Sequence, residues 1–152
     1  MSKNKKKVLA VASAGGHWIE LLRIKPAFKN YHVVFVSTNK SNAHEVQGYE
    51  FRHIANATRK SAWNFFVMFF QILGLILKIR PDVIVTTGSA PGLMTIAVGK
   101  LCRVKTAWIE SFSSVDELST SGKNARFFAD LYLTQWEHLA KENGPKYKGS
   151  IL

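Results

Sequence analysis

Residues 7–20 read KVLAVASAGGHWIE, and this stretch does most to decide the fold. Lys7–Ala12 is a short apolar run typical of a strand, and Trp18–Phe28 is an apolar-periodic segment typical of a helix. A strand, two adjacent glycines and a helix start are the layout of an anion-binding turn, because free N–H groups and the helix dipole favour negative charge there. Gly15 and Gly16 let the backbone turn sharply and let a phosphate approach closely.

His17 follows the two glycines at the mouth of this turn, where a proton-transfer group is useful. The motif differs from the dinucleotide fingerprint, which has three spaced glycines, and from the P-loop, in which Gly-Lys-Ser or Gly-Lys-Thr follows. Two interpretations are open from the motif alone. One is a phosphate-binding turn, and the other is a tight strand-to-helix connection that carries a surface histidine.

The chain has 152 residues, which fits one domain over residues 1–152 with a stable core. Its charge is unusual: 21 Lys and Arg against 10 Asp and Glu give +11, which indicates an anionic partner such as nucleic acid, anionic lipid or a phosphorylated substrate. Cys102 is the single cysteine, so an internal disulfide is excluded, and its apolar neighbours in sequence predict a buried, inert thiol. Lys3–Lys7 is interpreted as a basic arm before the first strand rather than as a signal peptide.

Strand-like runs alternate with helix-like segments along the chain, and several runs are continuously apolar, as in a parallel sheet covered on both faces. The expected strands are Lys7–Ser13, His32–Ser37, Tyr49–Ile54, Val83–Thr87, Thr106–Glu110 and Leu131–Thr134. The expected helices are Trp18–Phe28, Ala62–Lys78, Pro91–Cys102, Ser121–Phe128 and Trp136–Glu142; Asn39–Gly48 is a short helix or a loop, and Asn143–Gly149 is an irregular connector. The pattern predicts an α/β fold with a doubly wound, mostly parallel, Rossmann-like sheet.

Three loops follow predicted strands and should therefore meet at one edge of the sheet: Ser13–His17, Gly88–Gly92 and Glu110–Ser114. Ligands of such sheets bind beyond the carboxyl ends of the strands. In the second loop, Pro91 suits the first turn of a helix and Ser89 can cap it. Two glycine-bearing turns of this kind favour a phosphate or sugar site, although each also makes sense as turn chemistry alone.

The segment Ala62–Leu77 holds no charged residue and is flanked by Arg59, Lys60, Lys78 and Arg80. Its length of 16 residues is short for a membrane span, which needs about 20. A fully buried core helix is the plainer alternative. We favour a helix in the membrane interface, with its flanking cations at anionic headgroups. The side chains expected to contact the membrane are Trp63, Phe65, Phe66, Phe69 and Phe70.

Six short motifs occur in order along nearly the whole chain. They are Gly15-Gly16-His17-x-x-Glu20, Lys60-Ser61-Ala62-Trp63, Arg80-Pro81-Asp82-Val83-Ile84-Val85-x-x-Gly88, Glu110-Ser111, Leu118-Ser119-x-Ser121-Gly122-Lys123 and Asp130-x-x-x-x-Gln135-Trp136. The series resembles the membrane-anchoring subunit of the dolichol-pathway UDP-GlcNAc transferase, asparagine-linked glycosylation protein fourteen. It is still more similar to the bacterial counterparts in exopolysaccharide and capsule clusters.

The resemblance implies the N-terminal, acceptor-side half of a GT-B glycosyltransferase, with the donor-binding half on a separate polypeptide that shares the UDP-sugar. This half is then expected to bind a lipid-linked saccharide and to recruit its partner to the cytoplasmic face of the cell membrane. The sequence lacks the N-terminal transmembrane helix of the eukaryotic pattern, so Ala62–Leu77 and the basic arm are expected to give a peripheral or monotopic membrane contact. The second loop reads Gly-Ser-Ala-Pro-Gly rather than a tighter Gly-Pro-Gly.

The implied reaction moves a sugar from a nucleotide diphosphate to a hydroxyl of a polyprenyl-diphosphate-linked saccharide, which requires a base and stabilisation of the departing diphosphate. No Asp-x-Asp pair is present, so we expect no metal to clamp the diphosphate and no cofactor. The resemblance implies an inverting enzyme. His17 is the first choice of base, since a helix N-terminus favours the neutral ring. Glu20 lies one helical turn further and is expected to orient that ring or to bind acceptor hydroxyls. Glu110 is the competing base, with a loop cap as its alternative role.

The residues expected to bind substrate are Ser13, Gly15, Gly16, Glu20, Gly88, Ser89, Gly92 and Ser111. Ser121 is expected to cap a helix, and Asp130 with Gln135-Trp136 either holds the last elements together or faces the partner. A second hypothesis is a non-catalytic membrane scaffold for a partner that holds every catalytic group. Nucleic-acid binding is disfavoured, because the cations are scattered and the phenylalanines cluster in one apolar segment rather than among them.

Overall fold

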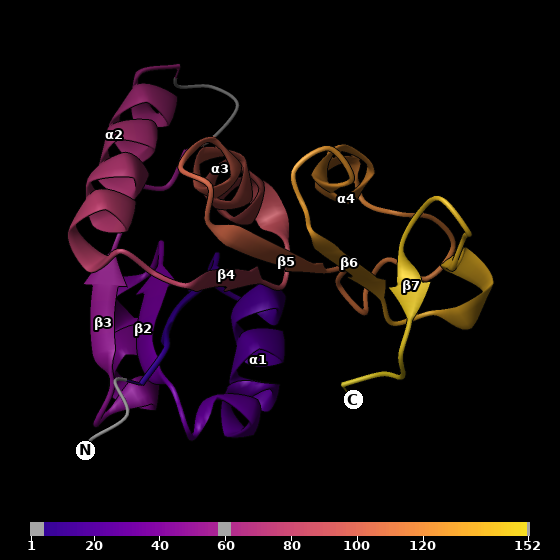
Figure 1. Ribbon diagram of the computed structural model, residues 1–152, viewed down its shortest axis with the longest axis horizontal. Coiled ribbons are helices and arrows are strands. Elements are labelled where there is room, and N and C mark those ends of the chain that lie inside the picture. The colour runs from indigo at the N-terminus through magenta and orange to yellow at the C-terminus, as the bar shows by residue number, and fades with distance from the viewer. Residues whose placement is uncertain (1–4, 58–61, 152) are drawn as a thin grey trace.

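The computed structural model describes residues 5–57 and 62–151, and within these residues seven strands form one sheet in the order β3-β2-β1-β4-β5-β6-β7 (Figure 1). Every pair of neighbouring strands is parallel. The strands are β1 (Lys7–Ala12), β2 (His32–Ser37), β3 (Glu50–His53), β4 (Val83–Thr86), β5 (Lys105–Ile109), β6 (Leu131–Thr134) and β7 (Lys146–Tyr147). The predicted α/β, parallel, Rossmann-like sheet is confirmed. Two sets of residues named above lie outside the described part of the chain: residues 3–4 of the basic arm, and Arg59, Lys60 and Ser61.

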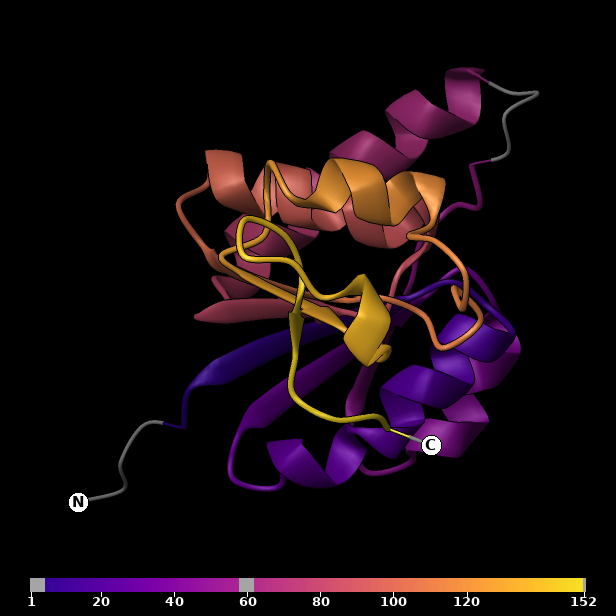
Figure 2. The same cartoon turned by 90° about the vertical axis from the view of Figure 1, so that its right-hand side faces the viewer.

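The connecting elements form one layer on each face of the sheet (Figure 2). The α-helices are α1 (Gly16–Arg23), α2 (Ala62–Ile79), α3 (Ser89–Leu101) and α4 (Thr120–Ala125), and the 3-10 helices are η1 (Lys25–Phe28), η2 (Lys40–Val46) and η3 (Glu137–Leu139). Helices α2, α3 and α4 cover one face, and α1 covers the other. Strand β1 serves both cores, since Leu9 and Val11 pack on the first side and Val8 and Ala10 on the second. This two-sided burial explains its continuously apolar sequence.

Several element boundaries differ from the predictions for local reasons. The expected helix Trp18–Phe28 is divided into α1 and the 3-10 turn η1, at whose start Pro26 stands. Ser119, not Ser121, caps α4, because its Oγ accepts the Gly122 N–H at 2.9 Å. The predicted helix Trp136–Glu142 is only the short η3, and the expected connector after it contributes the edge strand β7.

The order of the strands reverses between β1 and β4. β2 and β3 lie on one side of this point, and β5, β6 and β7 lie on the other. The chain leaves β1 into α1 and leaves β4 into α3, which cover opposite faces of the sheet. In open α/β sheets this divergence at the carboxyl ends of the strands creates the binding crevice. The predicted loops around His17 and Gly88 therefore lie together at the switch point.

Candidate functional site

His17 is held at the switch point by two hydrogen bonds to the end of β4. Its Nδ1 lies 3.0 Å from the carbonyl oxygen of Thr87, and the hydroxyl of Thr87 donates to the carbonyl oxygen of His17 at 2.6 Å. A carbonyl can only accept, so this contact assigns the proton to Nδ1. In the neutral ring Nε2 then carries the lone pair. The imidazole is thus half-buried, fixed in orientation and able to accept a proton at Nε2.

Gly88 provides the space in which the His17 ring sits. A Cβ built on Gly88 would lie 2.8 Å from Cε1 and 2.9 Å from Nδ1 of His17, and the residue has φ +124°. Both the close approach and the left-handed backbone require glycine here. Thr87 was missed as a functional residue, since its only sequence signal is its place between a strand and this glycine. Glu20 was expected to orient the ring or to bind acceptor hydroxyls, and in the structure Thr87 orients the ring instead.

Glu20 is buried and turns away from His17 toward the ends of β5 and β6. Its Oε1 accepts from the hydroxyl of Ser111 at 2.8 Å and from the N–H of Phe112 at 3.2 Å. Its Oε2 accepts from Nε2 of Gln135 at 3.3 Å. The predicted residues Glu20 and Ser111 are therefore brought together by a network that also recruits Gln135. A pocket of about 210 Å³ lies beside this network and is lined by Gly16, Ile19, Glu20, Arg23, Phe112, Gln135 and Ile151.

Glu110 is fully buried, and its carboxylate organises the loop between β5 and α4. Oε2 accepts from the indole N–H of Trp108 at 2.8 Å, and Oε1 accepts from the Ser114 hydroxyl at 2.8 Å and the Ser119 N–H at 2.9 Å. These bonds favour the loop-cap role over the role of base, since the carboxylate is sequestered from any ligand. Burial, together with the Glu110 charge, raises the pKa of neighbouring Tyr132 to about 12, so its hydroxyl stays protonated and donates to the Gly122 carbonyl oxygen at 2.8 Å.

Two helix starts face this edge of the sheet. Gly15 occupies the N-cap of α1 with φ +80°, and its carbonyl oxygen accepts from Trp18 and Ile19. The N–H groups of Gly16 and His17 precede any possible intrahelical acceptor and are free to bind an anion. Ser13 is half-buried just before this turn.

At the second helix start, that of α3, the prediction that Ser89 caps the helix is wrong. Gly88 holds the N-cap position, and Ser89 follows it with φ +72°. The Ser89 Oγ is buried and has no hydrogen-bond partner among the described residues. Gly92 is a packing residue, since a Cβ there would lie 2.1 Å from Oγ1 of Thr86 and would push α3 off β4.

The site is built from a proton acceptor, free N–H donors and buried carboxylates. Over residues 5–57 and 62–151, no group of three or more His, Cys, Asp and Glu side chains could hold a metal ion. The arrangement suits removal of a proton from a hydroxyl beside an anionic group. The ligand contacts that remain predictions are those of Ser13, Gly15, Gly16, Gly88 and Ser89.

Helix α2 has one buried face and one exposed face, and both carry apolar side chains. Met68, Ile72, Ile76 and Ile79 form its buried face, which packs into the core under α3. The opposite face exposes Trp63, Phe66, Phe70 and Leu77, with 60–74% of each residue's surface accessible. The two half-buried phenylalanines, Phe65 and Phe69, line an apolar groove of about 340 Å³ with Phe66, Phe70 and Met94 of α3. By length and composition α2 could also cross a membrane, but this is weak evidence because core helices of soluble proteins share both properties.

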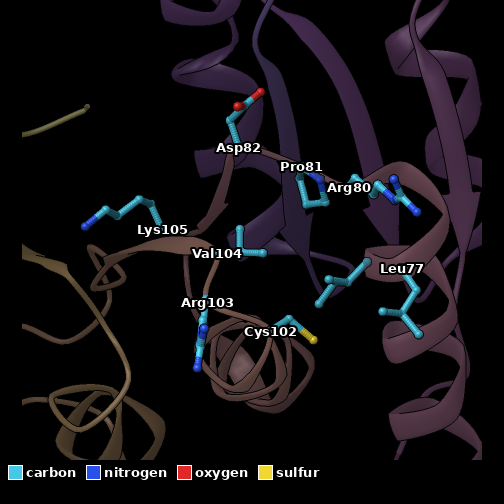
Figure 3. Close-up of a pocket in the computed structure, with 9 residues that line it drawn as sticks. Leu77, Arg80, Pro81, Asp82, Cys102, Arg103, Val104 and Lys105 are labelled. Atoms are coloured by element: carbon cyan, nitrogen blue, oxygen red, sulfur yellow. The ribbon is translucent and has the colours of Figure 1, made fainter.

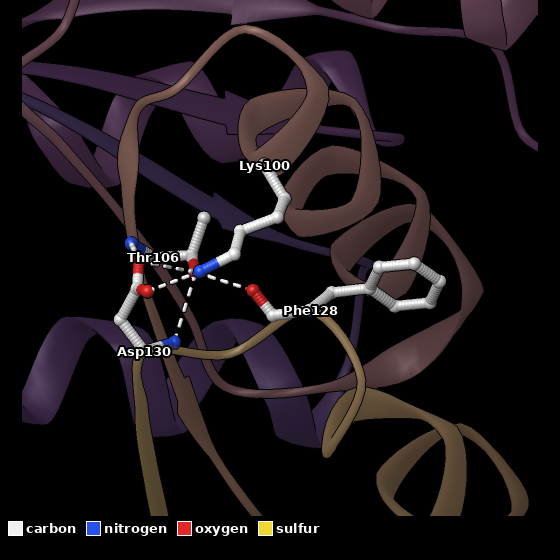
Figure 4. Close-up of polar contacts among 4 residues, drawn as sticks. All are labelled: Lys100, Thr106, Phe128 and Asp130. Atoms are coloured by element: carbon white, nitrogen blue, oxygen red, sulfur yellow. Dashed lines mark hydrogen bonds and ion pairs between the residues drawn. The ribbon is translucent and has the colours of Figure 1, made fainter.

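Asp130 directly precedes β6, at the amino ends of the strands and away from His17, and has a structural role (Figure 4). Its Oδ2 accepts from the N–H of Thr106 at 2.9 Å, and its Oδ1 pairs with Lys100 of α3. The Thr106 hydroxyl also donates to the Phe128 carbonyl oxygen at 2.6 Å. The ammonium group of Lys100 lowers the pKa of Asp130 below its ordinary value of 3.8. Asp130 therefore joins β5, β6 and α3, which is the first of the two roles that its motif left open.

Comparison with known proteins identifies the family. The model of oligosaccharide biosynthesis protein Alg14-like proteins matches residues 29–151. The UDP-N-acetylglucosamine transferase subunit ALG14 of Mus musculus is 28% identical over 184 residues, covering 96% of this chain and 83% of that protein. Among solved structures, MurG of Acinetobacter baumannii superposes with a TM-score of 0.76 at 13% identity, over 93% of this chain and 45% of MurG.

UDP-N-acetylglucosamine 2-epimerase of Rickettsia bellii superposes with a TM-score of 0.74 at 15% identity, over 97% of this chain and 45% of the epimerase. At these identities the two structures show the fold alone. This chain spans less than half the length of each of the two structures, and its sheet corresponds to one Rossmann-like domain of such enzymes. Together with the family match over most of the sequence, this places the chain in the Alg14-like family of oligosaccharide biosynthesis proteins.

Proposed function

We propose that this chain is the acceptor-side half of a two-chain glycosyltransferase. In this proposal a separate donor-binding half and this chain share a UDP-sugar, and the sugar is transferred to a polyprenyl-diphosphate-linked saccharide. The name of the mouse relative, a transferase subunit, supports the division into subunits. The match of this sheet to 45% of the MurG chain supports its assignment to one half of such an enzyme. The chain is expected to be inactive, or nearly so, without its partner.

The catalytic part of the proposal depends on the two hydrogen bonds between His17 and Thr87, which together we call the clamp. A base must present a lone pair in a fixed direction, and Nδ1 of His17 is committed to the Thr87 carbonyl oxygen at 3.0 Å while Nε2 is left for substrate. In the proposed reaction Nε2 takes the proton of the acceptor hydroxyl as that oxygen attacks the anomeric carbon. The bond to the UDP leaving group breaks in the same displacement, which inverts the anomeric configuration.

In this proposal backbone N–H groups, rather than a metal ion, bind the anionic groups of the substrates. The free N–H groups of Gly16 and His17 at the start of α1 suit a phosphate, and the left-handed turn at Gly88 and Ser89 opens a second helix start beside them. Glu20 and Ser111 shape the neighbouring pocket through their mutual hydrogen bond. Their expected contacts to acceptor hydroxyls are part of the proposal.

The exposed aromatic face of α2 supports association with the cytoplasmic surface of a membrane. Trp63, Phe66 and Phe70 would enter the interface, and the net charge of +11 would favour anionic lipid. A peripheral or monotopic attachment agrees with the packing of the other α2 face in the core. A role in exopolysaccharide or capsule synthesis is proposed on the resemblance to bacterial counterparts alone.

The test is His17→Ala in the complex with the donor-binding partner, with His44→Ala as an exposed control. Loss of a general base is expected to lower kcat by about 10²–10⁴-fold. Co-purification with the partner should be unchanged, since the imidazole is not expected to be needed for assembly. Normal turnover in an intact complex would refute the catalytic role. That outcome would support the alternative, in which this chain is a membrane scaffold and activator and the partner holds every catalytic group.

A further inference from the structure

A pocket of about 510 Å³ lies at the edge of the sheet opposite His17, between the ends of α2 and α3 (Figure 3). Its floor is apolar, with Pro81, Cys102 and Val104 in the middle. Three cationic side chains surround this floor, namely Arg80, Arg103 and Lys105. The half-buried thiol of Cys102 is part of a surface depression rather than of the closed core that its sequence predicted. The pocket shares no residue with the proposed active site, which lies at the other end of the strands.

The backbone at the two arginines is unusual. Arg80 directly follows α2 and has φ +51°, and Arg103 stands two residues after α3 and has φ +58°. Helices commonly end with a residue in this left-handed conformation, and that residue is usually glycine because a Cβ is disfavoured there. Here two arginines occupy such positions on either side of one pocket. The strain indicates that their side chains serve a purpose beyond ending the helices.

No specific contact within the described residues ties down these cationic side chains. The Ile79 carbonyl oxygen, near the end of α2, accepts from Nζ of Lys7 at 3.1 Å. The N–H groups of Arg103 and Val104 donate to carbonyl oxygens within α3. Asp82, which also lines the pocket, accepts from the N–H of Lys7 at 2.7 Å. Among the interactions of the described residues, the side chains of Arg80, Arg103 and Lys105 form no hydrogen bond or ion pair.

The directions of the side chains decide what kind of anion fits. In Figure 3 the Arg80 and Lys105 side chains extend to opposite sides of the pocket, and Arg103 extends away from both. They surround the depression instead of converging on one point, which disfavours a single small anion. Leu77 beside the pocket is 60% exposed and Leu101 is 80% exposed. Cations around exposed apolar side chains are typical of a surface that contacts several lipid headgroups.

We propose that this cationic rim, defined as Arg80, Arg103 and Lys105, binds phosphate headgroups of anionic lipids. The rim continues the exposed face of α2, whose last member is Leu77, so both ends of the helix reach the membrane. Helix α2 then lies along the membrane surface. The inference rests on the proposed membrane association, but not on the transfer reaction or on His17.

The test compares two variants of equal net charge in flotation with vesicles. Arg80→Gly with Arg103→Gly removes the rim arginines, and Lys141→Ala with Lys148→Ala removes two exposed cations near the β7 edge. The vesicles are pure phosphatidylcholine or an equimolar mixture with phosphatidylglycerol. Each basic residue near an anionic surface contributes about fivefold to binding, so the arginine variant should bind mixed vesicles about 30-fold more weakly than the parent chain. The lysine variant should bind within about threefold of the parent.

The arginine variant should not be destabilised, because glycine suits both left-handed positions. Its melting temperature should be no lower than that of the parent chain. Equal binding of the two double variants to mixed vesicles would overturn the proposal. An equal loss on pure phosphatidylcholine would also overturn it, since headgroup charge would then be irrelevant. If millimolar glycerol phosphate displaces the parent chain from mixed vesicles, the site binds free phosphate and the lipid assignment is wrong. Failure of sugar transfer in the His17 experiment leaves each of these outcomes unaffected.

Discussion

Gly122→Ala should strongly destabilise the fold, because the added methyl group meets the buried carboxylate of Glu110. A Cβ built on Gly122 lies 1.9 Å from Oε2 and 2.6 Å from Cδ of Glu110. The carboxylate or α4 must therefore move by roughly 1.5 Å to restore ordinary contact. Such a shift breaks the bond from the Trp108 indole N–H to Oε2, now 2.8 Å long. Hydrogen bonds to charged groups contribute about 1.5–3 kcal/mol, and with the strain we expect a loss of about 3–4 kcal/mol.

Urea unfolding, followed by the fluorescence of buried tryptophans such as Trp108, measures this loss directly. In a thermal melt it should correspond to a decrease in Tm of about 10 °C for a domain of this size. Gly74→Ala is the matched control, since Gly74 is inside α2 and a Cβ there meets nothing within 4 Å. The control should gain up to about 1 kcal/mol, because alanine favours a helix interior over glycine.

A double-mutant cycle with Glu110→Ala shows whether the contact itself is responsible. Glu110→Ala alone leaves the buried N–H groups of Trp108 and Ser119 without their acceptor. The same substitution also empties the space that the methyl group of Ala at position 122 would enter. In the double variant the second substitution should therefore add little further loss, with a coupling free energy of about 2 kcal/mol or more. Losses that add within about 0.5 kcal/mol would refute the steric reasoning.

Two further predictions concern the two edges of the sheet. Gly88→Ala places a Cβ 2.8 Å from the His17 ring and should therefore displace the proposed base. In the complex with the proposed partner, kcat should decrease about 100-fold while binding to that partner is kept. An unchanged kcat would contradict the role of the clamp. Asp130→Asn should cost about 1–2 kcal/mol at pH 7, measured by urea unfolding. Because the folded-state pKa of Asp130 is lowered, the carboxylate stabilises the fold above its ordinary pKa of 3.8, and this contribution is lost as the pH falls through the folded-state value. The stability of parent and variant should therefore converge in acid, and a gap that is constant with pH would contradict the assigned ion pair.

The sequence was sufficient for the parallel sheet and for the end of its strands at which the His17 and Gly88 loops meet. Continuous apolar runs predicted strands covered on both faces, and the glycine-bearing turns after β1 and β4 predicted where His17 and Gly88 would lie. The remaining predicted strands lie within a few residues of their observed bounds. The exception was β7, which is two residues long and exposed, so it leaves no apolar pattern to detect.

The roles of the carboxylates could not be predicted in the same way. Glu20, one turn from His17 along α1, was expected to act on that ring, yet it bonds Ser111 and Gln135 from distant strands. Glu110 ends a strand at the ligand edge, yet its bonds run to a neighbouring indole and to a loop nine residues later. Helix and strand periodicity fixes where a side chain starts, whereas its partners depend on how separate elements pack together.

The His17 ring is held in place by groups of this chain alone. Both hydrogen bonds that hold the residue come from Thr87 of this chain, and Gly88 of the same loop leaves room for the ring. Orientation of the proposed base is therefore a property of the β1–β4 switch point and precedes assembly. In the proposed two-chain enzyme, a donor-binding half would supply the nucleotide without rebuilding the acceptor side, which is a physical reason why such an enzyme can be divided between two polypeptides at this boundary.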